Sequence, residues 1–275
     1  MSGAGIADYL AKWKLDADGA PFETPSSRLC FVRRGNTPAV LKLFKPHADE
    51  ERSAAALKAL GGPCVCVLEE SGEAVLLERC MPATPLSHLV DAGRDEDATD
   101  IICDIVAALH AKRVPLDGWP RLEDWGQAFA RIRGMSHPAL SPDLIDRAEA
   151  EFFELCATQA ERRLLHGDIH HENILEDLSG WRVIDPKGIV GERCYEVVTA
   201  LHNPSGHPEL CTNPKAMMWR VERFAHHLGL DETRILRWIF AQSTLSAAWH
   251  VEDKNSNAEI AAAIATAQTA ERLLG

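Results

Sequence analysis

The chain has 275 residues, of which 46% are hydrophobic and 25% charged, and its formal net charge is −12. The apolar fraction is enough for a full core, and the length allows one large or two small domains. The acidic balance argues against non-specific binding to nucleic acid, which needs clustered lysine and arginine. It would suit a cationic small substrate, although acidic soluble proteins are common.

Membrane targeting is not expected from this sequence. Residues 1–19 contain no apolar run long enough for a signal peptide, and no later window approaches the uninterrupted apolar length of a membrane span. The eight cysteines are scattered, and no two pairs have zinc spacing. We therefore expect reduced, mostly buried thiols in a cytoplasmic protein.

The first 80 residues predict strands with one helix. Residues 28–35 and 37–44 read as a hairpin with its turn at Arg34-Gly35-Asn36. Because side chains alternate along a strand, Val40, Lys42 and Phe44 share one face. A lysine between two apolar residues is notable, although a lysine snorkelling at an edge strand gives the same pattern.

A helix is expected next, over 48–62, with acids in its first turn and a Gly-Gly stop. Two further strands, 64–70 and 73–80, surround a Ser-Gly turn. After Met81-Pro82 the periodicity becomes helical. The expected helices cover 97–114, 141–163 with a Ser or Asp cap, 216–229, 232–250 and 258–274. These patterns predict a small β-rich lobe and a larger helical lobe, with a boundary near 79–84 and a ligand cleft between them.

The stretch HGDIHHENIL, residues 166–175, crowds polar groups into ten residues. Residues 173–177 and 181–185 can pair as a short hairpin after this stretch. Asp168 and Asn173 then lie on the loop before one strand, and Asp185 lies at the end of the other, so the three side chains can converge. Their oxygen atoms suit Mg²⁺, which accepts one or two protein carboxylates together with substrate phosphates.

Phosphoryl transfer needs this set of groups. One carboxylate orients the attacking hydroxyl, and an Asn and a second Asp hold Mg²⁺ on the nucleotide phosphates. An upstream strand lysine contacts the phosphates and a helix glutamate steadies it, roles that Lys42 and Glu51 can fill. Glu50 competes with Glu51, because the helix phase cannot be fixed from sequence. The order Lys, Glu, Asp-x4-Asn, Asp-x-x-Gly predicts a kinase-like fold.

The histidines of this stretch raise the alternative of a metal hydrolase. His170 and His171 are adjacent and would face different ways in a regular element, and the His-Glu-x-x-His spacing is absent. We expect loop packing for His171 and Glu172. For His166 we expect a bracing role rather than proton transfer.

Several stretches together resemble the aminoglycoside and hydroxyurea phosphotransferases, specifically their streptomycin-kinase-like branch. They are LLHGDIHHENIL, VIDPKGIVGERCYEVV, HNP, AVLLER and FAQSTLSAAWHVED. The likeness runs from about Thr24 to Asp253. It implies an α+β, bilobal protein-kinase-like fold, with a small antiparallel β-rich N-lobe at 1–80 and a larger, mostly helical C-lobe at 81–275. It also implies ATP-dependent phosphorylation of a hydroxyl on a small molecule.

The resemblance implies roles for individual residues. Asp168 would be the catalytic base, Asn173 and Asp185 the Mg²⁺ ligands, and Lys42 the phosphate-binding lysine paired with Glu51. The hinge that offers backbone groups to adenine would be Leu77 to Cys80, which includes Glu78 and Cys80.

The loop over the phosphates departs from the glycine-rich kinase pattern. It reads ETPSSRL, where Ser26 and Ser27 would offer N–H and hydroxyl donors to phosphate. Glu192 and Glu196 occupy positions where many aminoglycoside kinases carry aspartate, and they could pin the loop.

The acceptor is expected to be a small molecule. The chain between Asp185 and Tyr195 is too short to build a peptide-docking platform. Carboxylates near a helix end could hold ammonium or guanidinium groups, although a polar helix end beside a core tryptophan is an equal explanation. The candidate acceptor residues are Trp249, His250, Glu252 and Asp253. Lys187 could contact a phosphate or lie in solvent.

Three functions stay open from the sequence. The leading one is an antibiotic-resistance kinase for an aminoglycoside such as streptomycin, or for a hydroxyurea-like compound. A metabolic kinase with an unrelated acceptor is the second, because the ATP machinery does not define the acceptor pocket. A catalytically silent nucleotide-binding module is the third, and the complete residue set disfavours it. We expect no nucleic-acid or membrane partner.

Overall fold

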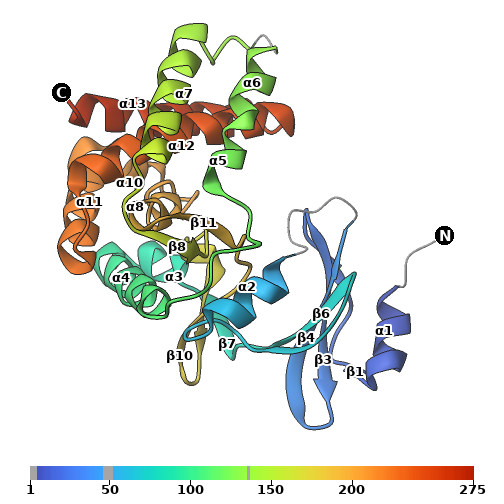
Figure 1. Ribbon diagram of the computed structural model, residues 1–275. Coiled ribbons are helices and arrows are strands. Elements are labelled where there is room, and N and C mark those ends of the chain that lie inside the picture. The colour runs from blue at the N-terminus through green and yellow to red at the C-terminus, as the bar shows by residue number, and fades with distance from the viewer. Residues whose placement is uncertain (1–4, 46–51, 135–136) are drawn as a thin grey trace.

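The computed structural model describes residues 5–45, 52–134 and 137–275. A β-sheet lobe built by the first part of the chain adjoins a larger lobe built mainly of helices (Figure 1). This confirms the α+β, bilobal arrangement expected from the sequence. The exact division at residues 80 and 81 remains a prediction.

The first lobe is one antiparallel sheet in the order β1-β3-β4-β6-β5, with β2 also paired to β3. Its strands are β1 (Asp16–Ala17), β2 (Phe22–Glu23), β3 (Ser27–Arg34), β4 (Thr37–Phe44), β5 (Val67–Ser71) and β6 (Ala74–Glu78). The predicted β3–β4 hairpin is confirmed, with Arg34 opposite Thr37 at its turn. Lys42 therefore lies on an inner strand between β3 and β6, and the edge-strand explanation of this lysine is wrong.

The two faces of the sheet are buried by different partners. Leu41 and its alternate neighbours on β4 pack in a small core with Tyr9 of α1 (Ile6–Trp13). On the opposite face, Val75 and Leu77 join the core that also contains α2 (Ser53–Leu60). The ammonium-bearing side chain of Lys42 lies on that second face and is 4% exposed.

The predicted helix over 48–62 is present from Ser53 to Leu60, and its first expected residues, 48–51, lie outside the described residues. Gly61 ends it with φ +61, a conformation that glycine adopts at no steric cost. The helix rests against the loop that follows Asp185, where a Cβ on Gly188 would lie 2.7 Å from the Cβ of Ala56. Only glycine allows this approach.

The second lobe contains the remaining elements. Its helices are α3 (Ser87–Asp91), α4 (Asp95–Ala111), α5 (Leu122–Trp125), α6 (Gln127–Arg133), α7 (Pro142–Ala157), α8 (Arg193–Glu196), α9 (Val198–Leu201), α10 (Pro208–Thr212), α11 (Pro214–Leu228), α12 (Glu232–Glu252) and α13 (Asn257–Leu273). Its strands are β7 (Pro82–Pro85), β8 (Arg162–Leu165), β9 (Ile174–Asp177), β10 (Gly180–Val183) and β11 (Ile189–Glu192). None of the described helices is long and apolar enough to cross a bilayer.

One predicted helix was wrong at its C-terminal end. The cap at Ser141 is confirmed, because its hydroxyl accepts the N–H of Leu144 at 3.2 Å. The helix stops at Ala157 rather than 163, and Arg162–Leu165 forms strand β8 instead. Pairing with β11 and burial of Leu164 and Leu165 override the helical propensity of this segment.

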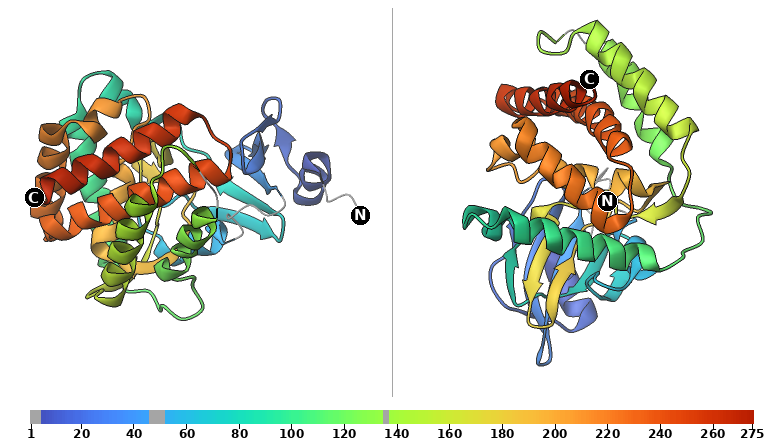
Figure 2. Two further views of the ribbon diagram at one scale, coloured as in Figure 1. Left: turned by 90° about the horizontal axis from the view of Figure 1, so that it is seen from above. Right: turned by 90° about the vertical axis from the view of Figure 1, so that its left-hand side faces the viewer.

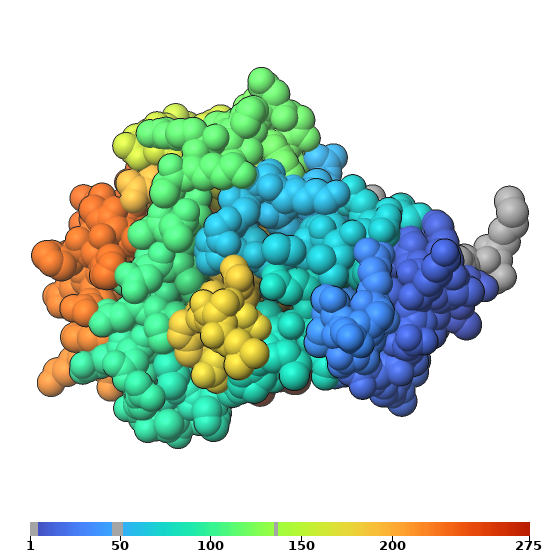
Figure 3. All heavy atoms as spheres, turned by 90° about the horizontal axis from the view of Figure 1, so that it is seen from below, coloured from blue at the N-terminus to red at the C-terminus, as the bar shows by residue number. Residues whose placement is uncertain are grey.

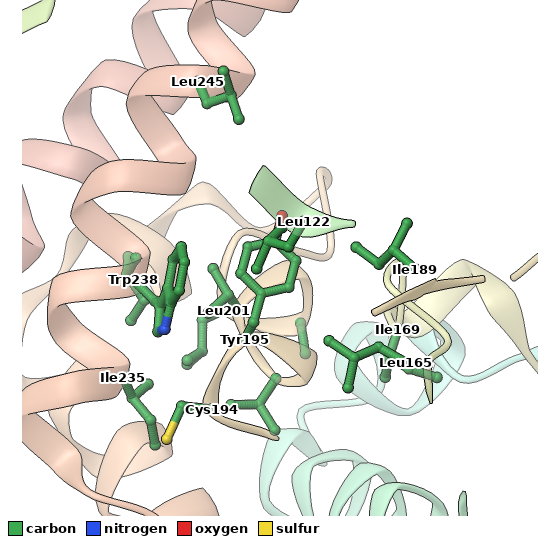
Figure 4. Close-up of a cluster of buried hydrophobic side chains, with 14 of the residues drawn as sticks. Leu122, Leu165, Ile169, Ile189, Cys194, Tyr195, Leu201, Ile235, Trp238 and Leu245 are labelled. Atoms are coloured by element: carbon green, nitrogen blue, oxygen red, sulfur yellow. The ribbon is translucent and has the colours of Figure 1, made fainter. Parts of the chain in front are cut away.

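Helix α12 is the centre of the second lobe. It lies beside α13 in both views of Figure 2 and also contacts α7 and α6. Its Trp238 is fully buried and meets the ring of Tyr195 edge-on, with centroids 5.1 Å apart. Figure 4 shows this pair between α12 and the side chains of Leu165, Ile169 and Ile189. The chain segments on either side of Asp168 are thus anchored in the main hydrophobic core.

The β9–β10 hairpin connects the lobes. Its strand β9 pairs with β7. Val183, the last residue of β10, forms an isolated β-bridge with Cys64, which precedes β5 in the chain. In Figure 3 the hairpin (yellow) reaches the surface between the sheet lobe and the helices of the second lobe. Residues that follow β10 therefore lie at the junction of the lobes.

Candidate active site

The loop after β8 carries Asp168. Gly167 turns the chain with φ +79, and a Cβ at this position would lie 3.0 Å from Ile189. The chain then passes Asp168 and forms a 3₁₀ turn at His171–Asn173 before β9 begins. A tight glycine turn on one side and a short helix on the other thus define the path of this loop.

A buried carboxylate fixes the loop backbone. Glu196 accepts the N–H groups of His166 at 2.9 Å and of Gly167 at 2.8 Å, and His110 Nε2 lies 3.2 Å from the same carboxylate. Burial alone would raise the pKa of Glu196, but the hydrogen bonds from His110 and from the Gly167 N–H lower it. Glu196 therefore pins the loop as an ionised group, as expected.

Glu192 has a different role from Glu196. Its carboxylate accepts from Arg234 Nε at 2.7 Å and also from the indole N–H of Trp238. Both donors belong to α12, so Glu192 joins the end of β11 to the central helix. It anchors the scaffold rather than the loop itself.

His166 braces the loop from inside. Its Nδ1 accepts the N–H of Asp168 at 3.2 Å, which leaves Nε2 to donate to the carbonyl of Ile184 at 2.9 Å. Burial lowers the pKa of His166, so the ring stays neutral and keeps both bonds. The bracing role predicted for His166 agrees with this geometry.

The two following histidines are not alike. His171 is fully buried, and neither of its ring nitrogens has a hydrogen-bond partner in the part of the chain that the structure describes. Burial, followed by the charges of Arg220 and His170, lowers its pKa to about 2. His170 lies by Glu172 and Asp168; burial opposes its charge, yet these carboxylates raise its pKa. Within the described residues no group of three or more His, Cys, Asp or Glu could hold a metal ion.

The predicted polar set converges at the junction of the lobes. Asn173 Nδ2 donates to the main-chain oxygen of Asp168 at 3.0 Å. The N–H of Ile184 donates to the carbonyl of Asn173 at 3.0 Å, which holds the start of one strand beside the end of the other. Asp185, with φ +57, follows directly, and its carboxylate lies 2.7 Å from Lys42 Nζ of β4. The sheet lobe and the loop therefore meet at an ion pair.

The donor atoms of this set fit Mg²⁺. The amide nitrogen of Asn173 is occupied by Asp168, so its oxygen faces the other side. The Asp185 side chain is 31% exposed and offers carboxylate oxygens beside Lys42. Mg²⁺ prefers oxygen ligands and usually takes only one or two of them from the protein. Asn173 and Asp185 offer two such oxygen ligands, next to Lys42, which can contact phosphate.

The sheet side holds the other predicted nucleotide residues. The turn between β2 and β3 is stabilised by Thr24, whose hydroxyl accepts the N–H of Ser27 at 3.1 Å, while the carbonyl of Ser26 accepts the N–H of Lys45 at 2.8 Å. Ser27 is fully buried and Ser26 is half-buried. Glu51 and its alternative Glu50 lie outside the described residues.

The predicted hinge, Leu77 to Cys80, begins within the last two residues of β6. Glu78 is held to Cys66 twice, by its main-chain N–H at 2.9 Å and by its carboxylate, which accepts the Cys66 N–H at 3.0 Å. Cys80 is buried, and burial raises the pKa of its thiol to about 11. Beyond it, the N–H of Met81 donates to Asp177 at the tip of the β9–β10 hairpin. The hinge is thus tied to both lobes.

A cavity of about 630 Å³ opens beside Asp168 in the second lobe. Three of the predicted acceptor residues, Trp249, Glu252 and Asp253, line it together with Asp168, whereas His250 does not. Lys187 also lines it, two residues after Asp185. The cavity joins the end of α12 to the loop that the sequence pattern identified.

Sequence reasoning missed the opposite wall of this cavity. The missed lining residues are Arg52, Pro120, Asp124, Trp125, Arg131, Gly167, Ile189, Thr199 and Gln242. Four of these nine residues, Pro120, Asp124, Trp125 and Arg131, come from α5, α6 and the segment before them, which are too short to give a helical period. The Asp124-Trp125 pair in α5 is a sequence signal that could have pointed to them.

The fold is similar to solved kinases of small molecules. An aminoglycoside phosphotransferase in ternary complex with ADP and hygromycin B matches with a TM-score of 0.70 at 16% identity, over 96% of each chain. An ethanolamine kinase from Plasmodium vivax matches with a TM-score of 0.69 at 14% identity, over 94% of this chain and 82% of that one. These likenesses confirm the protein-kinase-like fold.

Sequence similarity identifies the family within this fold. The family model "Aminoglycoside/hydroxyurea antibiotic resistance kinase" matches residues 12–254. A streptomycin 3''-kinase of Klebsiella pneumoniae is 36% identical over 89% of this chain and 91% of its own length. A hydroxyurea phosphotransferase of Kitasatospora aureofaciens is 30% identical over 98% of this chain and 78% of its own. The chain belongs to the aminoglycoside/hydroxyurea antibiotic resistance kinase family and is a phosphotransferase that acts on a hydroxyl group of a small molecule.

Replacing Glu196 by Gln should loosen the loop. The amide of Gln has the same shape as the carboxylate. Its NH₂ group cannot accept a hydrogen bond, so one of the two main-chain N–H groups at His166 and Gly167 would lose its acceptor. We expect the free energy of unfolding to fall by about 1–3 kcal/mol and kcat to fall by about tenfold to a hundredfold. Glu209→Gln is the control, because that carboxylate also bonds a histidine but is exposed. Wild-type kcat in Glu196→Gln would contradict the pinning role.

Acid should destabilise the fold through His171. Because its pKa is about 2 in the folded chain and about 6.5 when unfolded, the unfolded state binds the proton first as the pH falls below 6.5. The free energy of unfolding should then drop by about 1.4 kcal/mol per pH unit for this group. His171→Leu should reduce that slope in urea titrations, and His226→Leu, at an exposed position, should not. Equal slopes for His171→Leu and wild type would be evidence against a neutral buried ring.

Proposed function

We propose that this enzyme transfers the γ-phosphoryl group of ATP, with Mg²⁺, to a hydroxyl of a cationic aminoglycoside of the streptomycin type. The observation that carries the proposal is that Asp168 contacts both parts of the expected site. Asp168 lines the proposed acceptor cavity, and its main-chain oxygen accepts a hydrogen bond from Asn173 of the expected metal pair. Acceptor and nucleotide would therefore meet at this residue.

The proposed chemistry is mainly positioning and charge neutralisation. Asp168 would accept a hydrogen bond, and finally the proton, from the acceptor hydroxyl. Asn173 and Asp185 would hold Mg²⁺ through oxygen atoms, and Mg²⁺ would supply positive charge to the phosphate oxygens. Lys42 would turn from Asp185 towards the phosphates, because its ammonium already lies at that junction.

The nucleotide would bind against the second face of the sheet. Ser26 and Ser27 would offer donors to the phosphates, and Glu51 would pair with Lys42. The backbone at Glu78 and Cys80 would contact the adenine ring. The support for this part is the family membership and the position of Lys42 on the same face.

The character of the cavity favours a large cationic acceptor. Besides Asp168, the carboxylates of Asp124, Glu252 and Asp253 line it. Trp125 and Trp249 meet edge-on in its wall, with ring centroids 5.5 Å apart. Carboxylates bind ammonium and guanidinium groups by charge-assisted hydrogen bonds, and about 630 Å³ is ample for a multi-ring compound. A neutral hydroxyurea-like acceptor would use little of this surface.

The direct test is ADP release by the purified chain with streptomycin, other aminoglycosides, hydroxyurea and common sugars. Release that depends on an aminoglycoside supports the proposal. Release only with a sugar or another unrelated alcohol would replace it with a metabolic kinase. Nucleotide binding without acceptor-dependent release from any compound would refute phosphotransfer itself.

Replacing Asp168 by Ala should remove the group that receives the proton. We expect kcat to fall by about a hundredfold to ten-thousandfold, while calorimetric binding of ATP stays close to that of the wild type. Retention of wild-type turnover by Asp168→Ala would rule out this residue as the base. Loss of ATP binding as well would show that the residue acts on the nucleotide instead.

Replacing Asp185 by Asn should weaken Mg²⁺-dependent nucleotide binding by more than the roughly tenfold that loss of an outer-shell partner causes. The matched control is Glu176→Gln, an exposed residue of the same hairpin. Because Asp185 also pairs with buried Lys42, thermal unfolding without nucleotide must be measured for both variants. An unchanged Mg²⁺ titration would count against the metal-binding role.

A further inference from the structure

An ion pair lies in the wall of the acceptor cavity. Arg131 of α6 donates from Nε to Glu252 Oε1 at 2.7 Å and from Nη2 to Oε2 at 3.2 Å. Both residues line the cavity that contains Asp168. The Arg131 side chain is 53% exposed, whereas the Glu252 side chain is only 17% exposed. The carboxylate is therefore part of the wall, and the guanidinium lies over it from the solvent side.

Glu252 differs in this respect from the two other acceptor-side carboxylates. Asp124 and Asp253 line the same cavity and are exposed. Across the ranges that the structure describes, neither has a lysine, arginine or histidine within ion-pair distance. Only Glu252 is already bound to a cationic group of the protein. An incoming cation would find two carboxylates without a cationic partner among the described residues, of which Asp124 accepts the N–H of Arg121 at 3.1 Å, and one that is already paired with Arg131.

The guanidinium of Arg131, which occupies Glu252, has the same chemistry as a guanidinium group of a cationic acceptor. Two nearly parallel N–H···O bonds from a guanidinium to a carboxylate are the geometry by which Glu252 would also bind a guanidinium of an acceptor. Because Arg131 is more than half exposed, it can leave Glu252 and remain hydrated. Solvent around the exposed guanidinium screens its attraction to Glu252, so a ligand cation held by additional contacts can replace it.

We propose that Arg131 is a specificity-determining residue, which competes with a cationic group of the acceptor for Glu252 and gives up that carboxylate when the acceptor binds. The inference rests on the proposed function, because it takes the cavity as the acceptor site. It adds a selection step: an acceptor must carry a cation that displaces Arg131. A neutral acceptor gains nothing from Glu252 and leaves the pair intact.

The test compares two arginines of one helix. Arg131→Gln removes the competitor and should lower KM and the calorimetric Kd for streptomycin by about fivefold, the scale of an exposed ion pair. The KM for neutral hydroxyurea should not change. Arg133→Gln removes the same charge from α6, but Arg133 pairs with Asp146 and Glu149 of α7 and does not line the cavity. Its kinetic constants should remain those of the wild type.

A double variant separates competition from general charge effects. In the Glu252→Gln background, adding Arg131→Gln should change the KM for streptomycin by less than about twofold, because the contested carboxylate is absent. An unchanged or higher KM for streptomycin in Arg131→Gln would overturn the proposal, and so would an equal fall in Arg133→Gln.

The outcomes also separate this inference from the proposed function. If wild-type enzyme phosphorylates streptomycin but Arg131→Gln does not improve its KM, only the role of Arg131 fails. If wild-type enzyme releases ADP with neutral acceptors alone, both the competition by Arg131 and the proposal of a cationic acceptor are refuted. Circular dichroism of each variant excludes misfolding as the cause of a raised KM.

Discussion

The active-site loop depends on one ionised carboxylate that no solvent reaches. Glu196 accepts two consecutive main-chain N–H groups at the point where β8 ends, and His110 Nε2 of α4 lies 3.2 Å from the same carboxylate. A buried carboxylate without such partners would take up a proton or destabilise the fold. Because the hydrogen bonds are directional, they leave Gly167 and Asp168 one path. The position of Asp168 is therefore decided by a residue that does not touch the cavity.

From that fixed point the remaining functional groups are located by short links. His166 connects Asp168 to Ile184, and Asn173 connects the loop to the hairpin that leads to Asp185. Asp185 then reaches Lys42 across the junction of the lobes. The links are hydrogen bonds and one ion pair, and they join residues from 2 to 143 positions apart in the chain. Phosphoryl transfer depends on such positioning more than on covalent chemistry.

The sequence predicted what is set by local pattern or by fixed spacing. The β3–β4 and β9–β10 hairpins and the Asp-x4-Asn motif are short-range features, and the structure has them as expected. The end of the helix after Ser141 was wrong because strand pairing with β11, which is distant in the chain, decides it. The cavity wall from Asp124 to Arg131 was missed, because its short helices carry no period and their partner α12 lies more than a hundred residues away. The helix phase that would choose between Glu50 and Glu51 is outside the described residues.

The contact of Gly188 with Ala56 has a mechanical consequence. Where α2 of the sheet lobe meets the chain after Asp185, a methyl group rests on bare main chain. Sliding of these surfaces past each other breaks no directional bond there and changes only dispersion energy, which is small for each atom pair. The two lobes thus meet at this point by close packing alone, and any side chain in place of Gly188 would push α2 away from the chain after Asp185.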